Sequence, residues 1–275
     1  MPKTTEVPHE LREFNKLFEK LTYRHDYGNV FSDFMDYCVA CFLNTGDADT
    51  AKRLEKRYGK EYPLFKELFR EWLLTQRKMI VGETDWYDAF GSFYEVISSQ
   101  SKSSALGQFF TPPSIVDLMT ALTYQGAQKG ARERIADPCS GSGRMLLSFH
   151  ATFPGNYCFA ADIDPICAKM TAVNMVIHGC EGQAVCMDSL DPDDWRFGFS
   201  INPYIRQVNG IPHIVRIQKE QCYQWQSFQR DKAEFARKKA ETEATKVMEK
   251  EAQKMAAVTV KPEPTVGKFG QLSFF

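Results

Sequence analysis

The chain has 275 residues, of which 43% are hydrophobic and 25% charged, and its formal net charge is -1. This composition excludes a disordered tail, a fibre and a disulfide-stapled scaffold, and the length suits one large domain or two smaller ones. The sequence has no apolar run long enough to span a membrane, and residues 1–10 lack the profile of a signal peptide. We therefore expect a cytoplasmic protein with no membrane partner.

Residues 1–104 have the pattern of a helical domain. Apolar side chains recur at helical spacing, as in Leu11, Phe14, Leu17, Phe18 and Leu21, and no strand-like alternation interrupts them. We therefore predict several amphipathic helices in this block.

Residues 105–217 alternate between strand-like and helix-like segments. The strand-like runs are 134–139, 157–164, 183–190 and 197–204, with a shorter one at 211–217. The helix-like stretches are 112–124, 142–152 and 165–178. Since strands separated by helices of this length form βαβ units, we predict an α/β domain with a mostly parallel, doubly wound sheet.

Residues 218–258 are rich in Lys, Glu, Gln and Ala and predict a long, charged, weakly amphipathic helix. From residue 206 to 275 the sequence contains 13 Lys and Arg residues against 8 Asp and Glu residues. Such a segment is typical either of a protein that binds a polyanion or of a solvated helix. Residues 259–275 contain helix-breaking Pro and Gly and predict a flexible tail.

The 8 cysteines are scattered along the chain. Without an export signal, we expect them to be reduced and buried like small hydrophobic side chains. Cys38 and Cys41 form a C-x-x-C pair inside an apolar stretch, and no second pair at metal-binding spacing follows. The sequence therefore predicts no metal site.

A glycine-containing loop follows the first predicted strand. From Asp137 to Gly143 it reads Asp-Pro-Cys-Ser-Gly-Ser-Gly and leads into a predicted helix. Open α/β sheets bind ligands here, beyond the carboxyl ends of their strands. Gly141 and Gly143 let the backbone approach a ligand closely, and the helix N-terminus offers free N–H groups. The loop therefore predicts a nucleotide-like ligand.

Carboxylates at the ends of successive strands indicate which ligand this is. The loop matches neither G-x-G-x-x-G nor G-x-x-x-x-G-K-[ST], and Asp137 would repel a polyphosphate but attract a cationic amino group. Asp162 ends the second predicted strand, where it would accept the ribose hydroxyls, and Asp188 ends the third. Together they predict an S-adenosylmethionine site.

Four motifs resemble those of the adenine-N6 DNA methyltransferases, most closely the modification subunits of type I restriction-modification systems. In chain order they are Gly-Gln-Phe-Phe-Thr-Pro at 107–112, Asp-Pro-Cys-Ser-Gly-Ser-Gly at 137–143, Ala-Asp-Ile-Asp-Pro at 161–165 and Asn-Pro-Tyr at 202–204. The resemblance covers residues 80–205. It implies a Rossmann-like methyltransferase fold, shortened after its fourth strand and preceded by a helical domain, that methylates adenine N6 in DNA.

The resemblance also implies which residues bind S-adenosylmethionine. These are Phe109, Thr111, Pro112, Asp137, Ser140, Gly141, Ser142, Gly143, Asp162, Ile163 and Asp188. The loop would hold the methionine part, Asp162 the ribose and Asp188 the adenine. For Phe109 and Phe110, a hydrophobic staple ahead of the next helix is an equally good interpretation.

Asn202, Pro203 and Tyr204 are the implied catalytic residues. An exocyclic amine is activated when a side-chain amide oxygen and a backbone carbonyl accept its two N–H bonds, while an aromatic ring stacks on the flipped-out base. The family motif has a second proline that is missing here. Either Tyr204 is the stacking ring or Ile205 occupies its place, and the alternative function is a catalytically impaired cofactor-binding relative.

The resemblance implies partners as well. The family sheet continues with further strands and is joined by a DNA-recognition domain, so we expect DNA as substrate and a specificity or partner subunit. The charged helix would be the contact with that subunit or a solvated element. The last residues, Gln271, Leu272, Ser273, Phe274 and Phe275, resemble the bacterial sliding-clamp binding motif, which predicts recruitment to a sliding clamp.

Overall fold

The computed structural model describes residues 6–82, 85–99, 110–123, 126, 128–259, 265–266, 268 and 272–273. The chain forms two compact units, Met1–Trp225 and Gln226–Phe275. Among the predicted site residues, Phe109 of the cofactor set and Gln271, Phe274 and Phe275 of the clamp motif lie outside the described residues.

Helices fill the first part of the chain, as the periodicity predicts. They are α1 (Arg12–Thr22), α2 (Tyr27–Phe42), α3 (Ala48–Tyr58), α4 (Pro63–Met79) and α5 (Ala89–Ser99), with 3-10 turns at His9–Leu11 and Gly59–Glu61. Asp26 caps α2 and Asp47 caps α3, because each side chain accepts an N–H bond from the first turn. Pro63 sits in the first turn of α4, where its missing N–H is not needed.

Strands and helices then alternate, which confirms the predicted α/β class. The elements are α6 (Pro113–Thr123), β1 (Arg134–Asp137), α7 (Arg144–Thr152), β2 (Tyr157–Asp162), α8 (Pro165–Ile177), β3 (Glu181–Met187), β4 (Trp195–Ile201) and β5 (Ile214–Ile217). Each predicted strand overlaps an observed one.

The sheet differs from the predicted one in direction. Its strand order is β1-β2-β3-β4-β5, with β1, β2 and β3 parallel, whereas β4 runs antiparallel to β3 and β5 antiparallel to β4. The prediction of a mostly parallel sheet is therefore wrong for the last two strands. Only residues 188–194 join β3 to β4, and a parallel connection needs a crossover of about a dozen residues or more.

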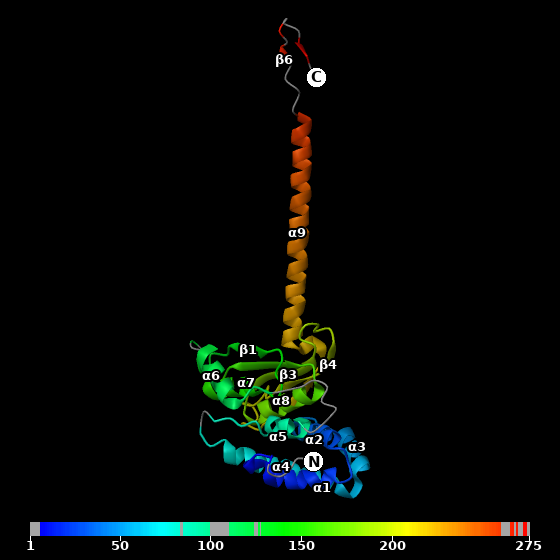
Figure 1. Cartoon of the computed structure of the whole chain (residues 1–275), viewed down its shortest axis with the longest axis vertical. Coiled ribbons are helices and arrows are strands. Elements are labelled where there is room, and N and C mark those ends of the chain that lie inside the picture. Colours follow the sequence, from blue (N-terminus) through cyan, green and yellow to red (C-terminus); the bar gives the residue numbers. More distant parts are fainter. Residues whose placement is uncertain are drawn as a thin grey trace. The chain divides into compact units, whose positions relative to one another are not determined.

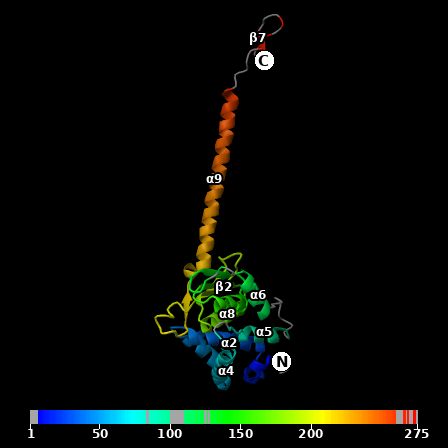
Figure 2. The ribbon, with the colours of Figure 1, turned by 90° about the vertical axis from the view of Figure 1, so that its left-hand side faces the viewer.

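The sheet is also not doubly wound. Since the order of β1, β2 and β3 does not reverse, the crossover helices α7 and α8 lie on the same face and contact each other. Figures 1 and 2 show the layers on that face, with α8 next to the sheet, then α2, and then α4. The other face carries a small cluster formed by Ala161, Val185, Met187, Ile217 and Cys222, against which Trp195 and Trp225 pack.

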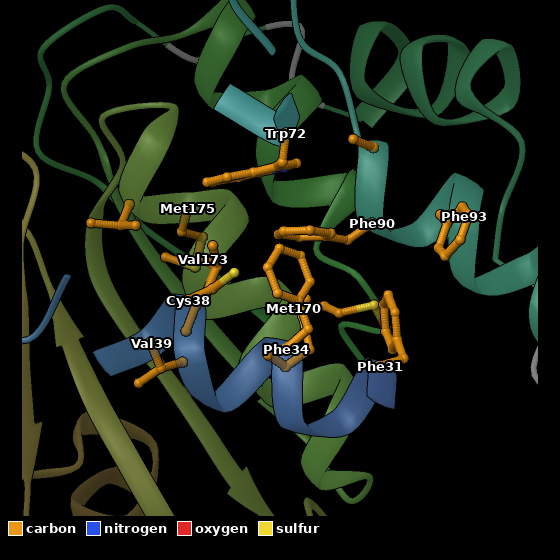
Figure 3. Packing of buried hydrophobic residues seen from close by; sticks show 14 of the residues in the cluster. Phe31, Phe34, Cys38, Val39, Trp72, Phe90, Phe93, Met170, Val173 and Met175 are labelled. Carbon is orange, nitrogen blue, oxygen red and sulfur yellow. The ribbon is translucent and has the colours of Figure 1, made fainter. Parts of the chain in front are cut away.

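One hydrophobic core joins the helical block to the sheet. Phe31, Phe34 and Cys38 of α2 interdigitate with Met170 and Val173 of α8, as Figure 3 shows. All five side chains are fully buried. The helical block therefore fixes the position of α8 and, through it, of β2 and β3.

Helix α6 and strand β1 leave surface without a partner in the described part of the chain. Four apolar side chains on one face of α6 are exposed, namely Ile115 by 44%, Leu118 by 53%, Met119 by 43% and Leu122 by 62%. Strand β1 is an edge strand among the described strands. An apolar helix face and an open strand edge are both surfaces that proteins usually cover.

The second unit consists mainly of the long helix α9 (Tyr223–Thr259), which begins after a 3-10 turn at Lys219–Gln221. Residues 230–255 of α9 are all exposed, and pairs such as Glu234 with Lys238 connect successive turns. Strands β6 (Thr265–Val266) and β7 (Leu272–Ser273) pair antiparallel. Among the described residues, no helix is both long and apolar enough to cross a membrane.

Candidate cofactor site

Two backbone N–H groups tie the loop after β1 to the end of β2, and a third closes the loop on itself. Gly141 donates to Oδ2 of Asp162 at 2.8 Å, Ser140 donates to the carbonyl of Ala161 at 3.0 Å, and Gly143 closes the turn on Ser140 at 2.7 Å. The loop therefore has a defined shape beyond the carboxyl ends of the parallel strands, where open sheets bind ligands.

Both loop glycines have backbone angles that favour glycine. Gly141 has φ +56°, and a Cβ there would lie 2.9 Å from the Phe110 ring. Gly143 has φ +92° and stands directly before α7, and a Cβ there would lie 3.1 Å from Thr171. A larger residue at either position would strain the turn or displace its neighbours.

Three carboxylates gather around Cys139 at this edge of the sheet. Burial raises the pKa of the Cys139 thiol, and the charges of Asp162, Asp137 and Asp188 raise it further. Burial also raises the pKa of Asp162, although the N–H groups of Asp164 and Gly141 oppose that shift. The structure thus brings together the three carboxylates that the sequence places at successive strand ends.

Asp137 is partly desolvated in the same place. Burial raises its pKa above the ordinary value of 3.8, and one hydrogen bond from the Cys139 N–H opposes the shift. A partly buried carboxylate with one N–H partner is stabilised by a cation. The edge is therefore suited to a ligand that carries positive charge and hydroxyl groups.

The remaining residues predicted to bind cofactor surround this edge. Ile163 is exposed by 47%, directly after the Asp162 side chain. Asp188 accepts an N–H bond from Leu190 at 2.8 Å. Thr111 and Pro112 are exposed ahead of α6, and the Thr111 carbonyl accepts a bond from Arg144 at 3.1 Å.

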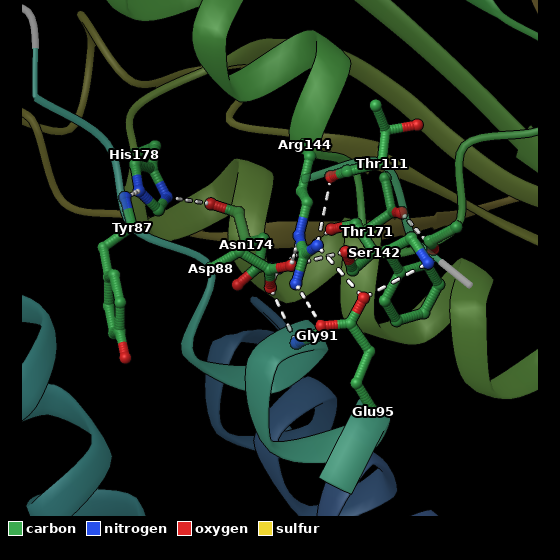
Figure 4. A network of polar contacts seen from close by, with 12 residues as sticks. Tyr87, Asp88, Gly91, Glu95, Thr111, Ser142, Arg144, Thr171, Asn174 and His178 are labelled. Atoms are coloured by element: carbon green, nitrogen blue, oxygen red, sulfur yellow. Dashed lines mark hydrogen bonds and ion pairs between the residues drawn. The ribbon is translucent and has the colours of Figure 1, made fainter. Parts of the chain in front are cut away.

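A buried polar network anchors the glycine loop to the segment before α5 (Figure 4). The sequence analysis did not predict this network. Asp88, 2% exposed, accepts hydrogen bonds from the Ser142 hydroxyl, the Arg144 Nε, the Asn174 amide and the Gly91 N–H. Asp88 precedes α5 and belongs to no motif. Since Ser142, Arg144 and Asn174 come from distant segments, only the fold reveals the role of Asp88.

Arg144 extends this network to the segment before α6. Its guanidinium donates to both carboxylate oxygens of Glu95, at 3.2 and 3.1 Å, and lies over the Phe110 ring at 5.3 Å. The Phe110 N–H in turn donates to Glu95 at 3.2 Å. Phe110 thereby covers Gly141, so that residues 110–112 and the glycine loop are fixed against each other.

Asn202 lies at the other edge of the sheet. Because β4 is antiparallel, its last residue, Ile201, pairs with Gly182 near the start of β3. The length of β3, about 3.3 Å per residue, therefore separates Asn202 from the carboxylates. The structure does not bring Asn202, Pro203 and Tyr204 together with the predicted cofactor residues.

The Asn202 side chain is buried and makes three hydrogen bonds within the fold. Its amide nitrogen donates to the carbonyls of Val176 at 3.1 Å and Cys180 at 2.9 Å, and its oxygen accepts the His213 N–H at 3.0 Å. The residue is 0% exposed and has φ +51°, a conformation that asparagine tolerates. In this conformation Asn202 offers no free acceptor to an adenine amine.

Tyr204 is exposed by 50%. Its ring stacks on the His213 ring with centroids 5.9 Å apart and planes 3° apart, and its N–H donates to His213 Nε2 at 3.2 Å. Pro203 is half-buried between Asn202 and Tyr204. The exposed ring remains available for stacking on a planar group, although not next to the carboxylates.

The structure is that of an α/β protein with a glycine turn and three carboxylates at one edge of its sheet. Residues 85–209 match the profile of the N-6 DNA methylase family. This match covers less than half of the chain, and it shows that this part of the chain is similar to the N-6 DNA methylases.

The chain is also similar to a curated protein. The chain is 28% identical over 151 residues to the Type II methyltransferase M.XamI of Xanthomonas campestris pv. amaranthicola. The match covers 54% of this chain and 26% of the relative, so the chain spans about a quarter of that protein. No solved structure matches the chain.

Proposed function

We propose that residues 85–209 bind S-adenosylmethionine and take part in the methylation of adenine N6 in DNA, as in a restriction-modification system. The observation that carries the proposal is the cluster of Asp137, Asp162 and Asp188 beside the Gly141 turn. The cofactor has a sulfonium, an ammonium, a ribose diol and an adenine amine, which are groups that carboxylates bind well. When bound, it would supply the methyl group.

Each carboxylate has a separate task in this proposal. Asp137 pairs with the ammonium group, Asp162 accepts the ribose hydroxyls with the lone pairs that the N–H groups of Gly141 and Asp164 leave free, and Asp188 lies near the adenine. Ser140, Ser142 and Gly143 shape the turn that receives the methionine part. Phe109, Thr111 and Pro112 would flank the cofactor on the side of α6.

Binding and transfer are tested together. Calorimetric titration of the full chain with S-adenosylmethionine is combined with transfer of labelled methyl to DNA that lacks N6-methyladenine, with the product identified by nucleoside mass spectrometry. Asp162→Ala should weaken cofactor binding at least tenfold, whereas the exposed Asp49→Ala on α3 should not. A wild-type chain that is folded but binds no cofactor would refute the proposal.

A second candidate function is favoured by the position of Asn202. If its amide stays bound to the carbonyls of Val176 and Cys180, the chain binds cofactor but needs a partner protein to supply the residues that accept the adenine amine. Cofactor binding without methyl transfer would support this candidate. Transfer by the chain alone that is lost in Asn202→Ala, with the melting temperature unchanged, would support Asn202, Pro203 and Tyr204 as catalytic residues.

The exposed surfaces of α6 and α9 and the last residues of the chain are the proposed contacts with partner proteins. A specificity or catalytic partner subunit would cover the exposed apolar face of α6 or contact the exposed charged surface of α9. The terminal residues Gln271, Leu272, Phe274 and Phe275 would recruit a sliding clamp. Pull-down with purified clamp should capture the full chain and not a variant lacking residues 271–275, and equal capture of both would refute the clamp proposal.

A further inference from the structure

A histidine and two cysteines from three separate segments meet inside the fold. A ring nitrogen of His150 and the sulfur atoms of Cys158 and Cys180 all lie within 4.8 Å of one another. His150 is in the last turn of α7, Cys158 is in β2, and Cys180 lies between α8 and β3. The cluster is near the start of β2, and therefore at the opposite edge of the sheet from the carboxylates of the cofactor site.

The imidazole of His150 hydrogen-bonds the Cys158 thiol, but one of its nitrogen atoms has no partner in the described part of the chain. Its Nδ1 atom is buried and has no hydrogen-bond partner among the described residues. The neighbouring imidazole of His178 differs, because its Nε2 accepts the Tyr87 N–H at 3.2 Å and its Nδ1 contacts the Asn174 carbonyl at 2.7 Å. A buried ring nitrogen without a partner is unfavourable unless it accepts a proton donor or binds a metal.

We propose that His150, Cys158 and Cys180 bind a zinc ion that ties α7, β2 and the start of β3 together. Imidazole and thiolate are the preferred ligands of Zn²⁺. Zn–S bonds of about 2.3 Å and Zn–N bonds of about 2.0 Å place tetrahedral ligand atoms roughly 3.5–4 Å apart, so the observed cluster needs only a small contraction.

The charges also favour this ion. Cys158 and Cys180 are both 0% exposed, and an isolated pair of thiolates would be unstable there. Two thiolates, one neutral imidazole and Zn²⁺ have no net charge, and binding releases two protons from the thiols. A monovalent soft ion would leave one negative charge in an apolar core. The fourth ligand position would be taken by a water molecule, as in other sites with three protein ligands.

The cluster also adjoins the segment that holds Asn202. The Cys180 carbonyl accepts the Asn202 amide at 2.9 Å, so the metal would also hold the segment in which Asn202 is anchored.

The test begins with the reduced wild-type chain, stripped of metal and titrated with Zn²⁺ and, separately, with Co²⁺. We expect one zinc per chain by elemental analysis, intense thiolate-to-cobalt absorption, and a rise in melting temperature on zinc addition. Cys158→Ser and His150→Gln should each lower zinc affinity by at least tenfold. The matched control is Cys38→Ser, which alters a fully buried cysteine of α2 outside the cluster and should keep full zinc affinity.

Three results would overturn the proposal. The reduced, folded wild-type chain binds no zinc at micromolar concentration, or Cys38→Ser lowers the affinity as much as Cys158→Ser does. The third is zinc binding that produces no thiolate absorption with cobalt.

Discussion

The carboxylate of Asp88 and the guanidinium of Arg144 form a buried ion pair, with Nε and Oδ2 2.7 Å apart. Asp88 precedes α5, whereas Arg144 opens α7 directly after the glycine loop. The pair therefore fixes the loop to the helical block, which explains why the cofactor site depends on residues outside its own motif.

Removal of the Asp88 carboxylate should destabilise the whole fold. Asp88→Ala leaves the Arg144 guanidinium buried with Glu95 as its remaining carboxylate partner, and breaking a buried pair costs about 3–5 kcal/mol. Urea denaturation measures this change. Asp194→Ala, which removes an exposed pair with Arg196 at 3.4 Å, should change the stability by less than about 1 kcal/mol. Equal effects of the two substitutions would contradict the role of Asp88.

The Gly141 turn should be needed for cofactor binding beyond its effect on stability. Gly141→Ala puts a Cβ 2.9 Å from the Phe110 ring at φ +56° and should weaken S-adenosylmethionine binding at least tenfold. Gly46→Ala is the matched control, because Gly46 has φ +67° but nothing lies within 4 Å of its added Cβ. Both substitutions should lower the stability by about 1–2 kcal/mol. Calorimetry should find the affinity changed only in Gly141→Ala.

The ionised Asp137 carboxylate should destabilise the folded chain, whereas it should stabilise the bound cofactor. Because burial raises its pKa above the ordinary value of 3.8, ionisation disfavours the folded state. This penalty is absent below the unfolded pKa and complete once the pH exceeds the raised folded pKa. Asp137→Asn should therefore raise the melting temperature at neutral pH, with the difference shrinking as the pH falls below 3.8, and should weaken cofactor binding. A variant less stable than wild type at neutral pH would contradict this.

We expect the Asn202 side chain to contribute mainly to the stability of the fold. Asn202→Ala removes two donors from the buried carbonyls of Val176 and Cys180 and should lower the stability by about 2–4 kcal/mol. Asn209→Ala is the matched control, since Asn209 has φ +52° but is exposed, and should cost about 1 kcal/mol. An unchanged melting temperature for Asn202→Ala would show that the side chain is free for another role.

The sequence by itself determined the elements and the loop. The spacing of apolar side chains predicts α2, α8 and β2. This spacing is a property of one continuous segment, so it can be seen in the sequence. The Asp137 to Gly143 motif is likewise contiguous, and the carboxylates of Asp162 and Asp188 follow strands whose ends are visible in the pattern. Parallel pairing of β1, β2 and β3 then brings these groups to one edge.

The tertiary structure alone decided which strand β4 pairs with and which distant segments meet. The short stretch 191–196 between the predicted strands already disfavours a parallel crossover. The pairing of β4 with β3, which moves Asn202 to the other edge, is a contact that only the fold reveals. The Asp88–Arg144 pair and the His150–Cys158–Cys180 cluster each join segments that share no motif. Their side chains meet because packing α2 and α8 on one face of the sheet fixes where each segment ends.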